Sequence, residues 1–539
     1  MKKNLLLLII LLMQSANLIF AQNLDNTFYK TYGTGERGIL NCTQETSDLG
    51  FISTGKTGKS YLIAGTWETL DSFLITKTDI HGNLQWSKSL SGFYYSEGIK
   101  VLKVNEGNYV VLGLGKYTKN DVMHTFLIKC DIFGNILWKK NYEKSENCYP
   151  SDICNSIDGG FAITSTTSDF TNNFNLLKVD SLGAVQYSKK VVSPFRSYSN
   201  NIISTSDNGY LFNVDTGFYY SQSGGRSWVN KMDNSGNLIW SKVFFSTGNT
   251  CTQCIYETSD GNILVRMSSS IQYDSISYSS RYLILLKLTS AGDTLWTKKY
   301  SLGAEYNFHI TESGDGNYII ASPSIHGTYP SKIFKTDTLG NIIWNRFYNH
   351  TNNGYPSDLF LTSISTTSDD GYVFSGESNR VTMQNSGNGF LIKTDSLGLL
   401  NCNNYSYTIT IFDSSDVKYS NSTLTFDTTY YATNSLLNVI NKPIMSYTYC
   451  ETIGIEETVF SVNGFSLYPN PANTQITIAY KAEAKNARIE LFNATGQKIN
   501  SFIYFNQNPT IDISDFANGL YLVKITDGKN SWVQRFVKN

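Results

Sequence analysis

The chain has 539 residues and nearly balanced charge, with 43 Lys and Arg against 44 Asp and Glu and a formal net charge of −1. No basic cluster follows its first few residues, so neither nucleic acid nor an anionic membrane surface is an expected partner. With 14% aromatic residues, 41 Gly and 9 Pro, the composition favours strands and turns.

The N-terminal residues predict a secretory signal peptide, residues 1–21. Lys2 and Lys3 precede an apolar run over residues 5–13, and cleavage is expected after the small residue Ala21. The run is shorter than the roughly 20 residues that cross a bilayer, and no later segment reaches that length, so no transmembrane segment is predicted.

One phrase of ten residues recurs seven times, beginning with the copy from Lys77 to Trp86. The mean period is about 53 residues, close to the length of known propeller repeats. A second turn rich in Asp, Asn and Gly precedes each copy, and short apolar runs lie between the turns. These patterns predict strands joined by tight hairpins. The residues expected to build the turns and the contacts between repeats are Asp79, Gly82, Trp86, Asp131, Gly134, Trp138, Gly236, Trp240, Gly292, Trp296, Gly340 and Trp344.

Seven four-stranded antiparallel units predict an all-β fold, a seven-bladed β-propeller over residues 22–402. The last copy lacks an outer strand with Trp. The segment from Phe28 to Tyr32 resembles the outer strands of the other copies, so it is predicted to complete the seventh blade. The alternative, an open array, would leave two unprotected ends.

The phrase Asp-x-x-Gly-Asn-x-x-Trp resembles the tryptophan-docking repeat of quinoprotein-like propellers and, more loosely, the Asp-box of sialidases. The resemblance implies that Asp and Gly form the hairpin between the third and fourth strands, and that Trp packs between blades. Neither activity is implied. The chain has no adjacent Cys pair such as often lies beside the quinone, and Pro194-Phe195-Arg196-Ser197 breaks the arginine motif of sialidases.

The eight Cys permit several disulfide arrangements in an exported protein. Cys251 and Cys254 form a local disulfide or two free thiols, with a redox pair or half of a metal site as the less favoured readings. Cys148 with Cys154, and Cys402 with Cys450, are further plausible bridges.

After the repeats, residues 403–450 are predicted to form a β-rich spacer and residues 451–464 a short acidic linker. Residues 465–539 alternate apolar and polar positions between turns rich in Asn, Gly and Pro. This pattern predicts a small C-terminal β-sandwich.

The C-terminal module closely resembles the type A C-terminal sorting domain of the type IX secretion system of Bacteroidetes. The resemblance rests on a Pro-Asn-Pro opening, a Thr-Gly-Gln turn, a Gly-Leu-Tyr strand and a basic end: Pro469, Asn470, Pro471, Gly496, Gly519, Leu520, Tyr521 and Lys538. It implies delivery to the periplasm by the signal peptide and passage through the outer membrane with the type IX secretion machinery as partner. Cleavage then leaves the cargo secreted or attached to the cell surface.

In the usual blade order, both hairpin turns of each repeat lie on one face, the turn face, and the other loops lie on the opposite loop face. The loops expected on the loop face are long, variable and aromatic, and such loops on a rigid scaffold commonly bind ligands. Tyr suits glycans or extended peptides, although these rings could instead pack the loops themselves. The candidate ligand-binding residues are Tyr94, Tyr95, Tyr149, Tyr198, Tyr219, Tyr220, Tyr306, Tyr329 and Tyr355.

No compact set of titratable residues indicates catalysis, so no catalytic residue, metal site or cofactor is predicted. The five His show no ligand spacing, and one Asp per turn is explained by turn bonding. Two carboxylates brought together by the fold would, however, be invisible in the sequence. The leading hypothesis is a secreted or cell-surface binding propeller for a glycan or protein. The alternative is a secreted polysaccharide-acting hydrolase with a propeller catalytic domain.

Overall fold

The described part of the chain is built from β-strands in two units, Met1–Thr452 and Ile453–Asn539. The computed structural model describes residues 27–33, 37–63, 66–104, 107–143, 146–167, 174–191, 197–198, 201–216, 226–245, 249–271, 280–301, 309–322, 331–348, 350–352, 355–357, 359–378, 387–400, 410–413, 418–421, 426–427, 431–434, 438–441, 445–451, 465–468, 472–480, 487–493, 497–504, 509–526 and 531–539. The predicted signal peptide and all but the first residue of the predicted linker lie outside these ranges. Within them, no helix has the length and apolarity needed to cross a membrane.

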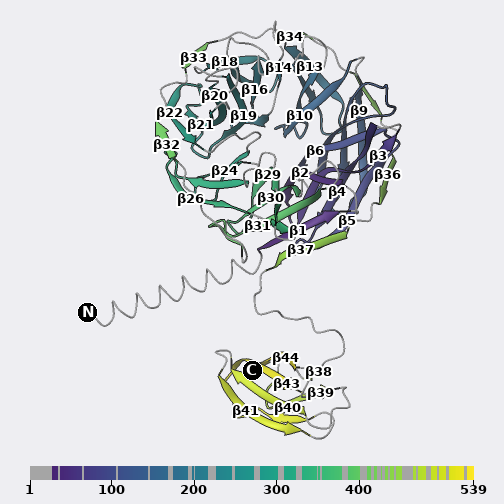
Figure 1. The fold of residues 1–539 in the computed structure, drawn as a ribbon, viewed down its shortest axis with the longest axis vertical. Coiled ribbons are helices and arrows are strands. Elements are labelled where there is room, and N and C mark those ends of the chain that lie inside the picture. Colours follow the sequence, from purple (N-terminus) through teal and green to yellow (C-terminus); the bar gives the residue numbers. More distant parts are fainter. Residues whose placement is uncertain are drawn as a thin grey trace, which may run out of the picture. The chain divides into compact units, whose positions relative to one another are not determined.

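The first unit is a ring of seven antiparallel sheets, the blades, numbered in chain order (Figure 1). From the centre outward, blade 1 contains β2 (Arg37–Glu45), β3 (Phe51–Ile63), β4 (Thr66–Thr78) and β5 (Leu84–Ser91). Blade 2 contains β6 (Tyr95–Lys103), β7 (Tyr109–Lys116), β8 (His124–Cys130) and β9 (Ile136–Glu143). Blade 3 contains β10 (Cys148–Asn155), β11 (Phe161–Thr167), β12 (Phe174–Val179) and β13 (Val185–Val191).

The other blades repeat this order. Blade 4 contains β14 (Ser197–Tyr198), β15 (Ile202–Ser204), β16 (Tyr210–Thr216), β17 (Arg226–Met232) and β18 (Leu238–Phe245), and blade 5 contains β19 (Asn249–Glu257), β20 (Ile263–Ile271), β21 (Ser280–Leu288) and β22 (Thr294–Ser301). Blade 6 contains β23 (His309–Glu312), β24 (Tyr318–Ser322), β25 (Lys332–Thr336) and β26 (Ile342–Phe347). The hairpin of β27 (His350–Asn352) and β28 (Tyr355–Ser357) precedes blade 7, with β29 (Leu359–Thr366), β30 (Tyr372–Ser378), β31 (Asn388–Thr394) and β1 (Phe28–Gly33). The predicted seven-bladed propeller is confirmed.

Strand β1 completes blade 7, as predicted. It pairs antiparallel with β31, with Phe28 opposite Lys393 and Tyr32 opposite Gly389. A buried apolar cluster then joins blade 7 to blade 1, where Phe28 and Leu391 pack with Leu40. The ring is therefore closed by a strand about 360 residues away in sequence from its partner, which protects the sheet edges that an open array would expose.

The Trp of one blade docks on the hairpin glycine of the next blade. The indole Nε1 of Trp86 donates a hydrogen bond to the carbonyl of Ile132, at 3.0 Å, and Trp240 makes the same contact with Ser290, at 3.2 Å. Gly134 has a φ of +79°, and an added Cβ there would lie 3.1 Å from the Trp86 ring. The site thus requires glycine both for its backbone conformation and for space.

In β1, Phe28 and Tyr32 take the places that Trp and Tyr occupy in other blades. An added Cβ on Gly82 would lie 2.6 Å from the Phe28 ring. The hydroxyl of Tyr32 donates to the carbonyl of Gly82, at 2.6 Å, as the hydroxyl of Tyr142 does to that of Gly183, at 2.9 Å. The closing strand therefore uses the same contacts as the internal blades.

The repeated Asp forms the hairpin between the third and fourth strands. In blade 1, Oδ1 of Asp79 accepts hydrogen bonds from the backbone amides of His81 (2.9 Å) and Asn83 (2.7 Å). The same pattern recurs at Asp131 and Asp337. These bonds account for the Asp at this position in six of the seven turns, and in blade 5 the hydroxyl oxygen of Thr289 accepts from the amide of Asp293 at 3.1 Å instead.

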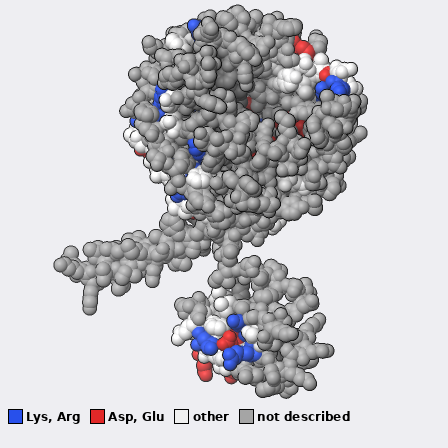
Figure 2. Space-filling model, viewed as in Figure 1, with Lys and Arg blue, Asp and Glu red and all other residues white. Residues whose placement is uncertain are grey.

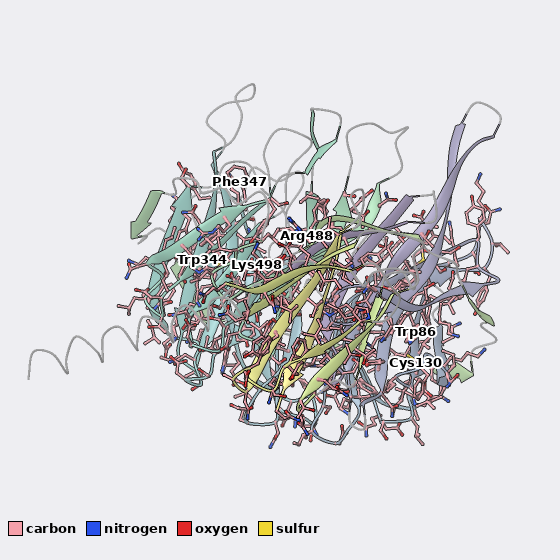
Figure 3. The ribbon with its side chains drawn as sticks, turned by 90° about the horizontal axis from the view of Figure 1, so that it is seen from below. Trp86, Cys130, Trp344, Phe347, Arg488 and Lys498 are labelled. Carbon is pink, nitrogen blue, oxygen red and sulfur yellow. The ribbon has the colours of Figure 1, made fainter. Side chains whose placement is uncertain are left out.

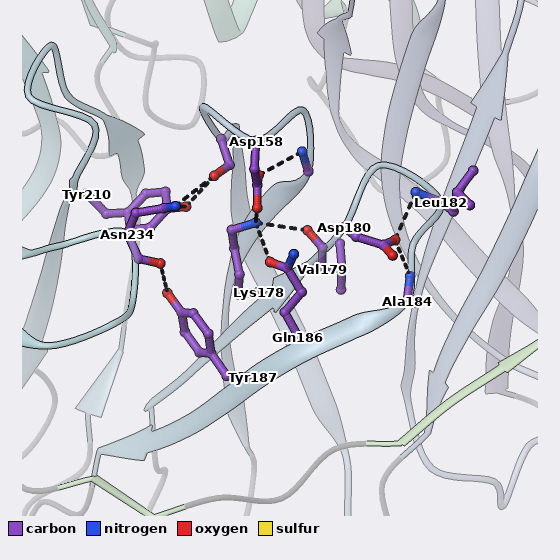
Figure 4. A network of polar contacts seen from close by, with 12 residues as sticks. Asp158, Lys178, Val179, Asp180, Leu182, Ala184, Gln186, Tyr187, Tyr210 and Asn234 are labelled. Carbon is purple, nitrogen blue, oxygen red and sulfur yellow. Dashed lines mark hydrogen bonds and ion pairs between the residues drawn. The ribbon is translucent and has the colours of Figure 1, made fainter.

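A buried Lys on the third strand ties the two hairpin turns of a blade together (Figure 4). Nζ of Lys178 lies 2.7 Å from Asp158 Oδ2 and also donates to Gln186 and to the carbonyl of Val179. Burial raises the pKa of Asp158, but the hydrogen bonds from Lys178 and Gly160 outweigh it and lower this pKa to about 2. Equivalent pairs are Lys77–Asp48, Lys231–Asp207, Lys287–Asp260, Lys335–Asp315 and Lys393–Asp369.

The segment predicted as a spacer supplies outer strands to the propeller. Its strands are β32 (Thr410–Asp413), β33 (Lys418–Asn421), β34 (Phe426–Asp427), β35 (Tyr431–Asn434), β36 (Asn438–Asn441) and β37 (Met445–Glu451). They pair in turn with the outermost strands of blades 5, 4, 3, 2, 1 and 7, where they lie along the circumference (Figure 1).

We call residues 410–451 the peripheral belt. The prediction of a spacer between two modules is therefore incomplete, because these strands belong to the first unit. Their pairing satisfies backbone groups on the outer edges of six blades. Among the described strands, β26 of blade 6 pairs only with β25.

The prediction of a Cys148–Cys154 disulfide is wrong. Both residues are free and buried in the single strand β10, six residues apart, which is too far for a disulfide in an extended chain. Cys254 is also a free thiol, so the predicted local disulfide with Cys251 is not formed. The Cys402–Cys450 pair cannot be compared, because its side chains lie outside the described residues.

The second unit is a two-sheet β-sandwich, as predicted. One sheet contains β38 (Phe465–Tyr468), β39 (Gln475–Tyr480) and β42 (Thr510–Asp512), and the other contains β41 (Lys498–Tyr504), β40 (Ala487–Asn493), β43 (Gly519–Thr526) and β44 (Ser531–Lys538). Alternate residues of both sheets, including Ile478, Leu491 and Val523, form one buried core. Of the predicted sorting residues, Pro469, Asn470, Pro471 and Gly496 lie outside the described ranges.

Candidate functional site

The loop face of blades 1 to 3 holds the candidate tyrosines whose side chains are described. Tyr94 and Tyr95 are half-buried, and Tyr149 is 40% exposed. Tyr198 and Tyr355 lie in strands whose side chains are not described, and Tyr219, Tyr220, Tyr306 and Tyr329 lie outside the described residues. The structure therefore describes the side chains of only three members of the predicted set, and the binding role of the set stays a prediction.

An aromatic stack on blade 2 forms part of this face. The Phe93 and Tyr117 rings are stacked, with centroids 4.8 Å apart and an interplanar angle of 13°. Phe93 also stacks on buried Phe126, whereas Tyr117 is 37% exposed. The His124 ring, at the start of β8, has its centroid 5.6 Å from that of the Tyr117 ring, which directly follows β7. The blade core thus supports Tyr117 from below and leaves part of it open to solvent.

Sequence reasoning missed Tyr117 because it follows a buried strand and looked like part of the repeat. Its only signal was position, since it begins the loop between the second and third strands of blade 2. Beside it, Nζ of Lys116 lies 5.3 Å from the Tyr94 ring centroid.

Blade 1, which precedes blade 2 in the ring, contains a long hairpin. Strands β3 and β4 each have 13 residues, against 8 in the equivalent strand β7 of blade 2. Figure 3 shows the hairpin, coloured purple, extending beyond the blades on the side of the loops.

A polar network joins the hairpin to blade 2. Nζ of Lys56 lies 3.1 Å from both Asp71 Oδ2 and Glu97 Oε2, and it donates to the Tyr95 hydroxyl at 3.3 Å. Tyr95 in turn donates to Glu97, whose second oxygen accepts from Asn41 at 2.7 Å. One nitrogen therefore brings two carboxylates together.

The electrostatics of this network fix its protonation. Burial disfavours a charged ammonium, but Glu97, Tyr95 and Asp71 together raise the pKa of Lys56 well above its usual range. Burial and the nearby charge of Glu97 raise the pKa of Tyr95 in the same way. At neutral pH the site thus holds a charged Lys56 and a protonated Tyr95, and both donate their hydrogen bonds within the network.

A second polar set surrounds the centre of the ring. Each blade contributes one residue to this set, at the same position in its innermost strand or directly before that strand. The seven residues are Cys42, Lys100, Asp152, Asn201, Cys254, His309 and Ser363. We call this set the central ring. No single residue type is common to the seven positions, so the sequence repeat gave no signal for them.

Members of the central ring join blades 2, 3, 4 and 5 to one another. Lys100 forms an ion pair with Asp152, at 2.6 Å, and Asp152 accepts from the amide of Ile202, at 3.0 Å. Asn201 accepts from the amide of Ile255, at 2.9 Å. Because these groups bond neighbouring strands, the set rigidifies the ring.

The charge around His309 suits this structural role. Burial and the positive charges of Lys100 and Arg266 lower the pKa of His309 to about 4, so its imidazole is neutral at physiological pH. Among the described side chains, no three His, Cys, Asp or Glu are grouped so that they could hold a metal ion.

Comparison with known proteins identifies the second unit. Residues 466–539 match the family of secretion system C-terminal sorting domains. This match indicates export by the type IX secretion system and interaction with its machinery. The chain thus combines an all-β body of propeller blades with a sorting domain. No curated protein matches the chain at a significant level.

Proposed function

We propose that this protein is a secreted or cell-surface binding propeller that recognises a glycan with the loop face of blades 1 to 3. A signal peptide would bring it to the periplasm, and the sorting domain would take it across the outer membrane of a Bacteroidetes cell.

The observation that carries the proposal is the partly exposed Tyr117 ring stacked on Phe93. An aromatic face held by the core can stack on a sugar ring with little loss of side-chain freedom. On the same pair of blades, Lys56 and Tyr95 hold the Glu97 carboxylate in a fixed position. Together they provide the apolar platform and fixed polar groups that ligand sites combine.

A glycan array followed by calorimetry tests this proposal with the chain ending at Glu451. Tyr117→Ala is expected to weaken binding about tenfold or more, as loss of an aromatic anchor does. Phe133→Ala is the matched control, because Phe133 is 70% exposed on a turn of the opposite face. Equal affinity of the Tyr117 variant and the wild type, or no glycan bound by the wild type, would defeat the proposal.

The second candidate is a polysaccharide hydrolase, favoured by the pairing of Asp71 and Glu97 on Lys56. Two neighbouring carboxylates are the usual requirement for glycoside hydrolysis. Release of reducing ends by the wild type, abolished in Glu97→Gln with an unchanged melting temperature, would favour this candidate. Glycan binding without release would favour the binding protein.

A further inference from the structure

The predicted Gly-Leu-Tyr motif separates into a buried and an exposed part. Tyr521 is buried, stacks on Phe536 with centroids 5.4 Å apart, and donates to the carbonyl of Ala517 at 2.6 Å. Leu520, the preceding residue, is 41% exposed. Tyr521 therefore serves the core of the sandwich, whereas the core does not account for an apolar residue at position 520.

Leu520 lies in a group of apolar side chains on the outer face of the four-stranded sheet. Val537, which is 39% exposed, stands directly opposite it on β44. Two residues along β43, Leu522 points to the same face and stands opposite Phe492 on β40. Both are half-buried. The inner face packs on the other sheet, so these four residues form an outward apolar patch.

Charged side chains border this patch on the same face. Lys524 stands opposite Glu490, which also pairs with Lys498 at 3.2 Å, and Arg488 is exposed further along β40. Figure 3 labels Arg488 and Lys498 on this sheet, and Figure 2 shows basic, acidic and uncharged side chains gathered on the C-terminal unit. Residues 465–539 contain eight Lys and Arg against five Asp and Glu, a net charge of +3, whereas the whole chain carries −1.

We propose that Phe492, Leu520, Leu522 and Val537 form the docking surface through which the sorting domain binds a component of the type IX secretion machinery. The partner surface would be apolar at its centre and rich in Asp and Glu at its border, to complement the basic rim. The sorting family supplies the kind of partner, and the exposed patch and its charges supply the place and the chemistry.

The test measures export of the full chain in a host with the type IX system. Leu520→Thr with Val537→Thr removes the exposed apolar groups but keeps strand-compatible residues. The secreted fraction is expected to fall about tenfold, as loss of two central apolar contacts would predict. Leu182→Thr, at a propeller position that is 65% exposed, should leave export unchanged.

A conservative variant separates docking from folding. Leu520→Met with Val537→Ile keeps the patch apolar and should be exported like the wild type. Normal export of the Thr double variant would overturn the proposal. So would equal loss in both double variants, since that result would show that any change at these positions disrupts the domain.

Discussion

The closing contact of the ring can be tested by Phe28→Ala. Phe28 is 2% exposed, meets the Phe51 ring edge-on with centroids 5.7 Å apart, and covers Gly82. Removing a buried Phe side chain costs about 3–5 kcal/mol from lost burial and the cavity left behind. In a unit of this size, that loss corresponds to roughly 3–5 °C in melting temperature.

The assay is thermal and urea unfolding of the chain ending at Glu451. Phe133→Ala provides the control, because Phe133 is 70% exposed and its loss should change stability by no more than about 0.5 kcal/mol. If both variants melt at the same temperature as the wild type, Phe28 does not close the ring and the account of blade 7 is mistaken.

Three further predictions concern turns and edges. Because folding lowers the pKa of Asp158 to about 2, its ionised carboxylate stabilises the folded state fully above about pH 4, and this stabilisation is lost as the pH falls toward 2. The urea unfolding midpoints of Asp158→Asn and the wild type should therefore converge in acid. Gly340→Ala should lower the melting temperature of the propeller more than Gly261→Ala does. Both glycines have positive φ, but only at Gly340 would an added Cβ have neighbours within 4 Å. A chain ending at residue 402 lacks the peripheral belt and should self-associate in size-exclusion chromatography, whereas one ending at residue 451 should not.

The ring could be predicted because its signals are local and repeated. All seven hairpins have Gly and six have Asp at fixed spacing, and each blade needs an aromatic residue to cover the next hairpin. The missing Trp of the last copy therefore pointed to Phe28. The buried pairs such as Lys178–Asp158 also recur in register, and a comparison of the Lys at the head of each copy with the preceding turn could have found them.

The peripheral belt and the central ring could not be predicted from local patterns. The belt strands have two to seven residues, and each pairs with an edge from a different blade. The central ring places Lys100 next to Asp152 and Asn201 near Ile255 only because the blades are arranged in a circle. At the candidate site, the tyrosines of blade 2 were predicted, but the supporting stack of Phe93 and Tyr117 depends on how two loops meet.

The central claim, a folded propeller exported by a separate sorting domain, is tested most directly by deleting residues 465–539. The two units have separate cores, so the truncated chain should keep the melting temperature of the propeller. Fractionation of a type IX host should find it in the periplasm, while the full chain reaches the surface or the medium. Normal export of the truncated chain would contradict the claim, as would loss of the propeller's thermal transition.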